Sequence, residues 1–401
     1  MIDKYCFFLI LLSISCVSAT ETVSWPDHIT RGVNLGGVDR YSEEDIAHLA
    51  LDWRVNSVRI LKNDIIPSTA PFKLDEQTRA DLYDLIGYCM KYRLYTVLAF
   101  SPSFRDQDAF FSNRAFMDAY KEFWIELATH YADSAGVAYD LMNEPHGDMA
   151  VSLWPDYAAE LTAAIREVDT VHTIVVEPCD WGWPAGFEHL VPTGDTNTVY
   201  GFHFYGPMDY THQRYADQMM NTPDAVWLQR AYPGTIVSEW GQEYWDKETM
   251  RSYVQKATAF KNRYGVRLWC GEFGCARWAI GADRWFADWI SLLDEAEIGW
   301  SYYSYREWHH MDIEMDPDER VNSTGRGETE LVTQFRQYFS NNEVPADFDR
   351  DGDIETDDII ALIVYQINYQ GSLAADFNRD GRATVADALS MLLASRNTGN
   401  Q

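Results

Sequence analysis

The sequence predicts an α/β fold, a closed eight-stranded (β/α)8 barrel followed by a small all-α module, and two observations support it. Short β-rich apolar runs alternate with amphipathic stretches over roughly 310 residues, the order expected for strand-helix units around a parallel sheet. Near residue 341 the composition then changes sharply into two acidic repeats that each contain a glycine. An open doubly wound sheet is the alternative for the first part.

Eight segments are predicted as strands because each is a short, nearly continuous apolar run, as buried parallel strands are. They are Ile29–Leu35, Asn56–Leu61, Leu94–Phe100, Val137–Met142, Thr173–Glu177, Val199–Phe204, Arg267–Glu272 and Ile298–Ser304. Helices are predicted where apolar residues recur at helical spacing. They are Glu43–Trp53, Asp75–Tyr92, Asn113–Tyr131, Asp156–Val168, Glu248–Tyr264, Asp283–Glu295 and Glu330–Phe339. The long segment Tyr205–Lys247 is expected to shape the wall of a cleft.

Composition excludes several classes of protein. The chain has 401 residues, of which 46% are hydrophobic and 23% charged, so it can bury a sizeable core and is not disordered. Its formal charge of −30 repels phosphate groups, which makes nucleic acid and anionic membranes poor partners. The 15 Trp and 24 Tyr residues suit stacking on the flat faces of sugars. We expect a monomer.

Residues 1–19 are predicted to be a secretory signal peptide. Lys4 precedes the apolar run Tyr5–Ile14, and small residues up to Ala19 fit a signal-peptidase site. A buried N-terminal helix and a lipidated Cys16 are the alternatives. The prediction implies a secreted protein with a large domain over 20–340 and a small module over 345–396.

Cleavage of the signal would leave four cysteines, Cys89, Cys179, Cys270 and Cys275. Four cysteines in a chain of this size do not make a disulfide scaffold. Their pairing stays open.

Polar residues gather where the predicted strands end. In (β/α)8 barrels the reacting groups lie on loops at the carboxyl ends of the strands. The residues at these positions are Arg59, Asn143, Glu144, His203, Tyr205 and Glu272. His203 is interpreted as a donor to a sugar, with a structural histidine as the alternative.

Glu144 and Glu272 form the best pair of carboxylates for glycosidic bond hydrolysis. One carboxyl group must protonate the leaving oxygen, and the other must meet the positive charge that develops at the anomeric carbon. Asn143 offers a neutral donor for a sugar hydroxyl, and Tyr205 can hydrogen-bond to an ionised Glu272. Glu177 and Glu239 are the competing carboxylates, and composition does not exclude them.

The ordered motifs Arg31-Gly-Val-Asn-Leu-Gly, Asn56-Ser-Val-Arg-Ile, Asn143-Glu-Pro, Gly201-Phe-His-Phe-Tyr with Thr211-His-Gln, Gly271-Glu-Phe-Gly and Ile298-Gly-Trp-Ser-Tyr resemble those of glycoside hydrolase family 5. The resemblance covers about residues 25–339. It implies a TIM barrel with Glu144 as acid/base and Glu272 as nucleophile, in a retaining reaction.

The same resemblance implies that the sugar being cleaved contacts Arg59, Asn143, His203 and Tyr205. Two positions depart from the family pattern. The third strand runs into Ser101 without the histidine that is common there, and Tyr303 stands where the family usually has a tryptophan that floors the subsite.

Two segments near the C-terminus have the spacing of EF-hand-type calcium loops, with oxygen side chains at alternate positions and glycine at position 6. An apolar helical run, Ile359–Ile367 or Ala388–Ala394, follows each loop. The expected Ca²⁺ ligands are Asp347, Asp349, Asp351, Asp353 and Asp358 in the first loop and Asp376, Asn378, Asp380, Arg382 and Asp387 in the second. An acidic solvated tail is the alternative.

The paired loops resemble a type I dockerin, which implies docking onto a cohesin-type scaffold protein. Loop positions 10 and 11 are Thr356-Asp357 in one copy and Val385-Ala386 in the other, so the two copies present unlike surfaces. The alternative is a calcium-stapled cap without a partner.

The expected function is a secreted, endo-acting hydrolase of β-1,4-glucan. Mannan, xyloglucan and β-1,3-glucan are the alternative substrates, and a non-catalytic carbohydrate-binding barrel is the alternative from another class. No HExxH motif or Cys/His cluster occurs, so no cofactor is expected in catalysis, and calcium is expected to be structural.

Overall fold

A computed structural model describes residues 25–26, 30–134, 136–215, 230–238, 241–317, 325–340, 342, 356–368, 375–378 and 382–398. The predicted signal peptide, the competing Glu239 and the calcium-loop residues Asp347, Asp349, Asp351, Asp353 and Asp380 lie outside these ranges.

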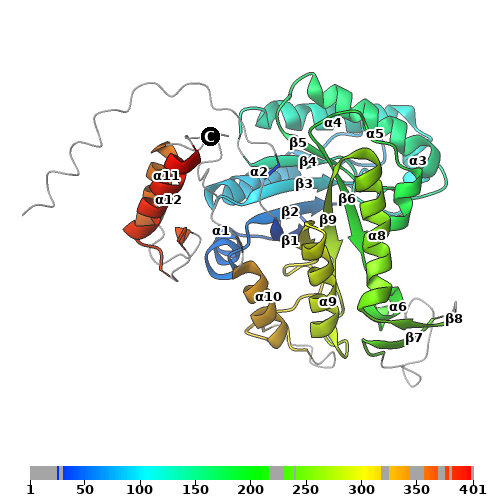
Figure 1. The fold of residues 1–401 in the computed structure, drawn as a ribbon. Coiled ribbons are helices and arrows are strands. Elements are labelled where there is room, and N and C mark those ends of the chain that lie inside the picture. Colours follow the sequence, from blue (N-terminus) through cyan, green and yellow to red (C-terminus); the bar gives the residue numbers. More distant parts are fainter. Residues whose placement is uncertain are drawn as a thin grey trace, which may run out of the picture.

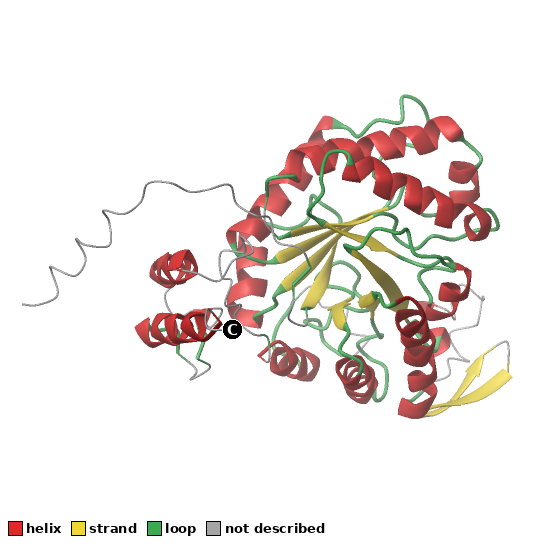
Figure 2. Ribbon diagram, turned by 45° about the horizontal axis from the view of Figure 1, so that its top comes forward, coloured by secondary structure: helices red, strands yellow, loops and turns green. Residues whose placement is uncertain are grey.

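Eight parallel strands close into a barrel in the order β1-β10-β9-β6-β5-β4-β3-β2. They are β1 (Arg31–Gly36), β2 (Ser57–Lys62), β3 (Tyr95–Phe100), β4 (Val137–Asp140), β5 (Thr173–Val176), β6 (Thr198–Phe204), β9 (Arg267–Phe273) and β10 (Gly299–Tyr302). Figure 2 shows the strands at the centre and the helices around them. The (β/α)8 TIM barrel is therefore confirmed, and the alternative of an open sheet is wrong.

Both faces of the strands are buried, which is why each strand reads as an apolar run. Outward residues such as Val58 and Ile60 pack against the helices in the main core. Inward residues of β3, β4, β5, β6 and β9 form a second cluster inside the barrel, closed by Trp25. The Trp25 ring packs edge-on against Tyr95 and Trp269, at centroid distances of 5.5 Å and 5.6 Å.

The outer helices follow the strands (Figure 1). They are α2 (Glu76–Lys91), α4 (Arg114–Tyr131), α5 (Ala150–Arg166), α8 (Lys247–Tyr264), α9 (Ala282–Glu295) and α10 (Glu330–Ser340), with the short α3 (Gln107–Phe111), α6 (Met208–Thr211) and 3₁₀ helix η2 (Pro184–His189) in loops. Side chains cap the N-termini of α2, α4 and α8. Asp75, Asn113 and Asp246 each accept a hydrogen bond from an amide in the first turn of the helix that follows.

Two predicted helices differ from the structure. The segment predicted as one helix over Glu43–Trp53 is α1 (Glu43–Ala47) followed by a π-helical turn, η1 (His48–Trp53). Helix α5 begins at Ala150, six residues before the predicted start, because Pro155 lies within the helix rather than before it.

Part of the long segment after β6 forms an antiparallel hairpin, β7 (Gly234–Ser238) and β8 (Gly241–Trp245). The hairpin projects from the barrel beside α6 (Figure 1). The stretch that reaches the cleft is Tyr205 to Tyr215, which confirms for these residues that the segment shapes a cleft wall.

The apolar runs after the two calcium-type loops are helical, as α11 (Thr356–Asn368) and α12 (Val385–Thr398). Leu362, Tyr365, Ala388 and Met391 form a separate small core between them. Figure 1 shows the two helices side by side and apart from the barrel strands.

The four cysteines are buried and unpaired. No helix among the described residues is both long enough and apolar enough to cross a membrane.

A buried aspartate holds the turn that leads into β5. Asp169 accepts hydrogen bonds from the amides of Val171 and His172 at 2.9 Å and 3.0 Å, from His172 Nδ1 at 2.7 Å and from the Tyr139 hydroxyl at 2.8 Å. Burial opposes ionisation, but the His172 side chain and these amides lower the pKa of Asp169 to about 2.

We predict that Asp169→Asn reduces the free energy of unfolding by about 2–3 kcal/mol at pH 7. Because the folded pKa lies below the unfolded value, this stability is present above about pH 4 and is lost as the pH falls toward about 2. Urea unfolding at several pH values measures it, with Asp84→Asn on the exposed face of α2 as the control. An Asp169→Asn variant as stable as the control would contradict the prediction.

Candidate active site

A cleft of about 770 Å³ lies at the carboxyl ends of the barrel strands. Carboxylates and aromatic rings line it together. The lining residues are Leu61, Asn63, Phe104, Asn143, Glu144, Asp180, Trp181, Trp183, Tyr205, Met208, His212, Tyr215, Glu272, Tyr303 and Trp308.

Arg59 lies fully buried below this cleft and contacts three carboxyl groups. Its Nη1 donates to Glu272 Oε1 at 2.6 Å, its Nη2 to Glu177 Oε1 at 2.7 Å, and its Nε to Asp140 Oδ2 at 3.0 Å. Burial alone disfavours the cation, but these carboxylates outweigh it and raise the pKa of Arg59. A buried charge of this kind is tolerated because every side of the guanidinium has a partner.

Two asparagines complete the surroundings of Arg59. Asn34 Oδ1 and Asn143 Oδ1 accept from its Nη1 and Nη2, at 3.1 Å and 2.9 Å. Asn34 also donates to the carbonyl of Gly271 at 2.8 Å, which ties β1 to the segment that carries Glu272. The amide oxygens therefore set the orientation of both the guanidinium and the strand ends around it.

Glu144 follows β4 in a left-handed backbone conformation, with φ of 52°. Such a conformation is uncommon for residues other than glycine, and it persists where surrounding contacts fix it. Here the amide of Glu144 donates to Glu177 Oε2 at 2.8 Å, and its carbonyl accepts from Gln107 Nε2 at 3.1 Å. These contacts hold the side chain of Glu144 at the cleft.

Glu272 and His203 are brought together by the pairing of β6 with β9. The two residues face each other in the register of these strands, directly after a β-bulge between Phe202 and His203. Bulges re-aim side chains and occur often next to active sites. The Tyr205 hydroxyl donates to Glu272 Oε2 at 2.7 Å, which confirms the hydrogen bond expected from the sequence.

The two glutamates of the predicted pair meet in one place. One ligand atom each from Glu144, His203 and Glu272 lie within 4.8 Å of one another, and His203 Nδ1 is 3.0 Å from Glu144 Oε1. This spacing also fits a metal ion. Arg59, bonded to Glu272 at 2.6 Å, already neutralises this carboxylate, which weakens its attraction for a metal cation.

The carboxyl groups that share His203 have opposite pKa shifts. Burial, followed by the charge of Glu272, raises the pKa of Glu144 to about 7. Burial also opposes ionisation of Glu177, yet His203 and Arg59 lower its pKa to about 2. His203 is itself disfavoured as a cation by burial, but the surrounding glutamates raise its pKa well above the ordinary value.

Aromatic side chains form the walls of the cleft. After β5, Trp181 is 43% exposed and stacks on His146 at a centroid distance of 3.5 Å, with Phe104 beside it at 5.7 Å. After β10, the ring of Trp308 packs edge-on against that of Tyr215 at 5.5 Å. Flat, partly exposed rings of this kind suit the apolar faces of sugars.

The structure brings the predicted site residues together around this cleft, namely Arg59, Asn143, Glu144, His203, Tyr205, Glu272 and Tyr303. Arg59 and His203 are buried and contact the cleft residues Glu272 and Glu144, respectively. Ser101, at the position without the expected histidine, is buried at the end of β3.

Sequence reasoning missed several contributors. Asn34 and Asp140 both contact Arg59, and their signal was a polar residue at an inward position of an apolar strand. Glu177, which the sequence analysis weighed as a competing carboxylate, is fully buried and bonded to Arg59 and to the amide of Glu144, so it supports the pair rather than facing the cleft. Trp181 and Trp308 lie on loops, where no periodic pattern points to them.

Comparisons with known proteins agree with this geometry. Residues 18–308 match the family model described as cellulase (glycosyl hydrolase family 5). Endoglucanase C of Acetivibrio thermocellus is 28% identical over 258 residues, covering 59% of this chain and 74% of that protein. Cellodextrinase A of Ruminococcus flavefaciens is 25% identical over 284 residues, covering 64% and 80%.

Solved structures share the fold. Endoglucanase Cel5A of Thermotoga maritima has a TM-score of 0.61 at 18% identity, covering 77% of this chain and 96% of that chain. The cellulose synthase subunit Z of Clostridioides difficile has a TM-score of 0.63 at 18% identity, covering 77% and 99%. Because the family model spans more than half of the sequence, the chain belongs to the cellulase family, glycosyl hydrolase family 5, and is a glycosidase of the cellulase type.

Proposed function

We propose that this protein hydrolyses a β-linked glucan, with β-1,4-glucan as the preferred substrate, by a retaining double displacement in which Glu144 is the acid/base and Glu272 the nucleophile. The observation that carries the proposal is the close approach of these two carboxyl groups in one cleft, with atoms within 4.8 Å. Retaining glycosidases hold their carboxyl groups about 5–5.5 Å apart, whereas inverting ones need about 6.5–9.5 Å to admit a water molecule.

The reaction proceeds in two steps. Glu144 enters protonated, as its pKa of about 7 allows, and donates its proton to the departing oxygen. Glu272, held by Arg59 and Tyr205, attacks the anomeric carbon and forms a glycosyl-enzyme. The carboxylate of Glu144 then takes a proton from water, which attacks the same carbon and releases Glu272. Two displacements leave the anomeric configuration unchanged.

The cleft supports a polymeric substrate. Aromatic rings line it at two places, because Trp181 follows β5 and Trp308 follows β10, strands that β6 and β9 separate in the barrel. A chain of sugars can stack on both while its scissile bond lies over Glu144 and Glu272. This arrangement favours endo action and disfavours a non-catalytic carbohydrate-binding barrel, for which the pair of carboxyl groups has no use.

The names of the relatives favour glucan, because Endoglucanase C and Cellodextrinase A are among them. A mannan is the second candidate. A solved structure of Thermotoga maritima Cel5A in complex with mannotriose shares the fold, with a TM-score of 0.61. Tyr303 stands in the cleft where the family usually has tryptophan, and we expect this exchange to affect which sugar is preferred.

We further propose that residues 1–19 are a cleaved signal, that the protein is a secreted monomer and that residues 345–396 bind two Ca²⁺ ions. Asp358, Asp376 and Asp387, at the ends of the predicted loops, are all buried. Asp387 also accepts from the amides of Asn378 and Thr384, at 3.0 Å and 2.6 Å. Buried carboxylates suit a cation with oxygen ligands. Docking to a cohesin-type scaffold is the proposed use of this module.

We predict that the pKa of Glu144 is near 7 and falls in Glu272→Gln, because that change removes a neighbouring negative charge. Carboxyl carbon NMR measures both values. In the wild type, kcat/KM should decline above about pH 7 as Glu144 loses its proton. A Glu144 pKa that is unaffected by Glu272→Gln would contradict the electrostatic coupling.

We predict that Glu272→Gln and Glu144→Gln each lower the hydrolysis of soluble β-1,4-glucan by at least about 10³-fold, since each removes a group that acts on the reacting atoms. Reducing-sugar release with product sizing measures activity and endo action, and NMR of the first product shows its anomeric configuration. Glu122→Gln, on the exposed face of α4, is the matched control. Wild-type inactivity on both β-glucan and β-mannan panels would overturn the proposed function.

We predict that chelating calcium unfolds the C-terminal module, because its buried carboxylates then repel one another. Circular dichroism should show a loss of helix with EGTA that added Ca²⁺ restores, and Asp387→Ala should weaken the response. Activity on soluble substrate should stay nearly intact, also when residues 342–401 are removed. Unchanged helicity after chelation would rule out a structural calcium role.

A further inference from the structure

The buried carboxylate of Glu177 contacts several groups of the site at once. Glu177 directly follows β5 and has no exposure to solvent. Its Oε2 accepts from the amide of Glu144 at 2.8 Å. Its Oε1 accepts from Arg59 Nη2 at 2.7 Å and lies 3.0 Å from His203 Nε2. Both oxygens of this side chain are therefore engaged, although it does not line the cleft.

Two of these contacts lead to Glu144. The left-handed backbone of Glu144, with φ of 52°, is uncommon for a residue with a side chain and persists where contacts fix it. In the part of the chain that the structure describes, Glu177 is the one acceptor for the Glu144 amide. His203 lies against Glu177 with one ring nitrogen, and its other nitrogen is 3.0 Å from Glu144 Oε1. Glu177 thus holds the backbone of Glu144 directly and its carboxyl group through His203.

Arg59 depends less on Glu177. The other side chains that accept from its guanidinium, at 2.6 to 3.1 Å, are Asp140, Glu272, Asn34 and Asn143. Glu272 keeps its own bonds to Arg59 and to the Tyr205 hydroxyl when Glu177 is replaced. A change at Glu177 should therefore act on Glu144 rather than on Glu272.

The backbone of Glu177 is fixed independently of its carboxyl group. Trp154 Nε1, from α5, donates to the Glu177 carbonyl at 2.8 Å. Gly182 leaves room for the carboxyl group, because a Cβ atom added there would be 3.1 Å from Glu177 Oε2. Gly182 also has a φ of 69°, which glycine adopts readily. Replacing the Glu177 side chain should therefore leave β5 in place.

We propose that Glu177 is a positioning residue for the hydrolysis proposed above and that it acts through Glu144. By accepting the Glu144 amide, it fixes the turn that presents the acid/base to the departing oxygen. A misplacement of about 1 Å at a reacting group can lower the rate by about 10²-fold. The loss should therefore appear in the step that needs the proton of Glu144.

The position needs an ionised carboxylate, because both of its oxygens must accept. Burial opposes ionisation, yet His203 and Arg59 lower the pKa of Glu177 to about 2, so the group stays ionised. In Glu177→Gln one oxygen becomes an NH₂ group, which only donates. The remaining oxygen should face Arg59, since hydrogen bonds to a charged partner are stronger. The NH₂ group then faces the Glu144 amide, which loses its acceptor.

The test compares two substrates that differ in their need for an acid. The leaving group of soluble β-1,4-glucan must be protonated, whereas dinitrophenyl β-cellobioside releases a stable anion. We expect Glu177→Gln to lower kcat/KM about 10²-fold on the glucan and less than about fivefold on the aryl glycoside. Glu144→Gln should show the same difference between substrates, because kcat/KM covers the reaction up to the glycosyl-enzyme, where Glu144 gives its proton.

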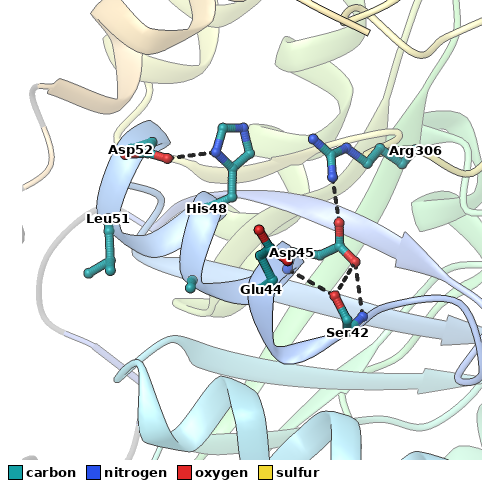
Figure 3. A pocket seen from close by; sticks show the side chains of 8 residues that line it. Ser42, Glu44, Asp45, His48, Leu51, Asp52 and Arg306 are labelled. Carbon is teal, nitrogen blue, oxygen red and sulfur yellow. Dashed lines mark hydrogen bonds and ion pairs between the residues drawn. The ribbon is translucent and has the colours of Figure 1, made fainter. Parts of the chain in front are cut away.

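Asp45→Asn is the matched control. Asp45 also accepts from a backbone amide, that of Ser42 at 2.9 Å, and from an arginine, Arg306, as Figure 3 shows. These residues line a second cavity of about 440 Å³ that shares no lining residue with the cleft. Asp45→Asn should leave kcat/KM unchanged on both substrates.

Equal losses on the two substrates would place the effect on Glu272 or on the fold and would overturn the proposal, as would an unchanged Glu177→Gln. A purely structural role would lower the melting temperature without separating the substrates. If Glu177→Gln does not fold, Glu177→Asp carries the same comparison, because it keeps the charge beside Arg59 but is too short to reach both partners.

The inference rests on the proposed function, and the two can fail separately. A wild type that is inactive on both substrates overturns the function and the inference together. An active wild type whose Glu177→Gln variant loses the same factor on both substrates overturns the inference alone.

Discussion

The arrangement of the site depends on a guanidinium buried among three carboxyl groups. Arg59 contacts Asp140, Glu177 and Glu272 from the inward face of β2, and its side chain has no exposure to solvent. Without this cation, the carboxylates would repel one another in a medium where charges are poorly screened. Because the pairs join β2, β4, β5 and β9, the same interaction that neutralises charge also fixes how the strand ends meet.

Closure of the barrel turns these contacts into a site. Strands far apart in the chain become neighbours, so that Glu272 of β9 pairs in register with His203 of β6. The bulge before His203 shifts one residue in that register, and the imidazole then reaches both Glu144 and Glu177 at 3.0 Å. A regular ladder at this point would turn the following side chains to the other face.

The strands and the polar residues at their ends could be predicted from the sequence. Burial on both faces makes each strand an apolar run, and the reacting groups appear as polar residues where these runs end. The buried residues that hold these reacting groups in place could not be predicted in the same way. Asp140 and Glu177 look like ordinary strand-end acids until their distances to Arg59 are known. The π-helical turn at His48–Trp53 has the same periodic pattern as a helix.

Glu144 and Glu177 show how one chemical group acquires two roles. Both carboxyl groups lie 3.0 Å from a nitrogen of His203, one from Nδ1 and the other from Nε2. Glu177 also accepts hydrogen bonds from Arg59 and from the amide of Glu144. These donors stabilise its negative charge, so it stays ionised. The carboxyl group of Glu144 is bonded to His203 and lines the cleft, and burial together with the charge of Glu272 raises its pKa to about 7, so it holds a proton close to neutral pH. Both side chains are glutamates, so the difference lies in their hydrogen-bond donors. Donors keep Glu177 ionised, whereas Glu144, with fewer of them, can exchange a proton with the substrate.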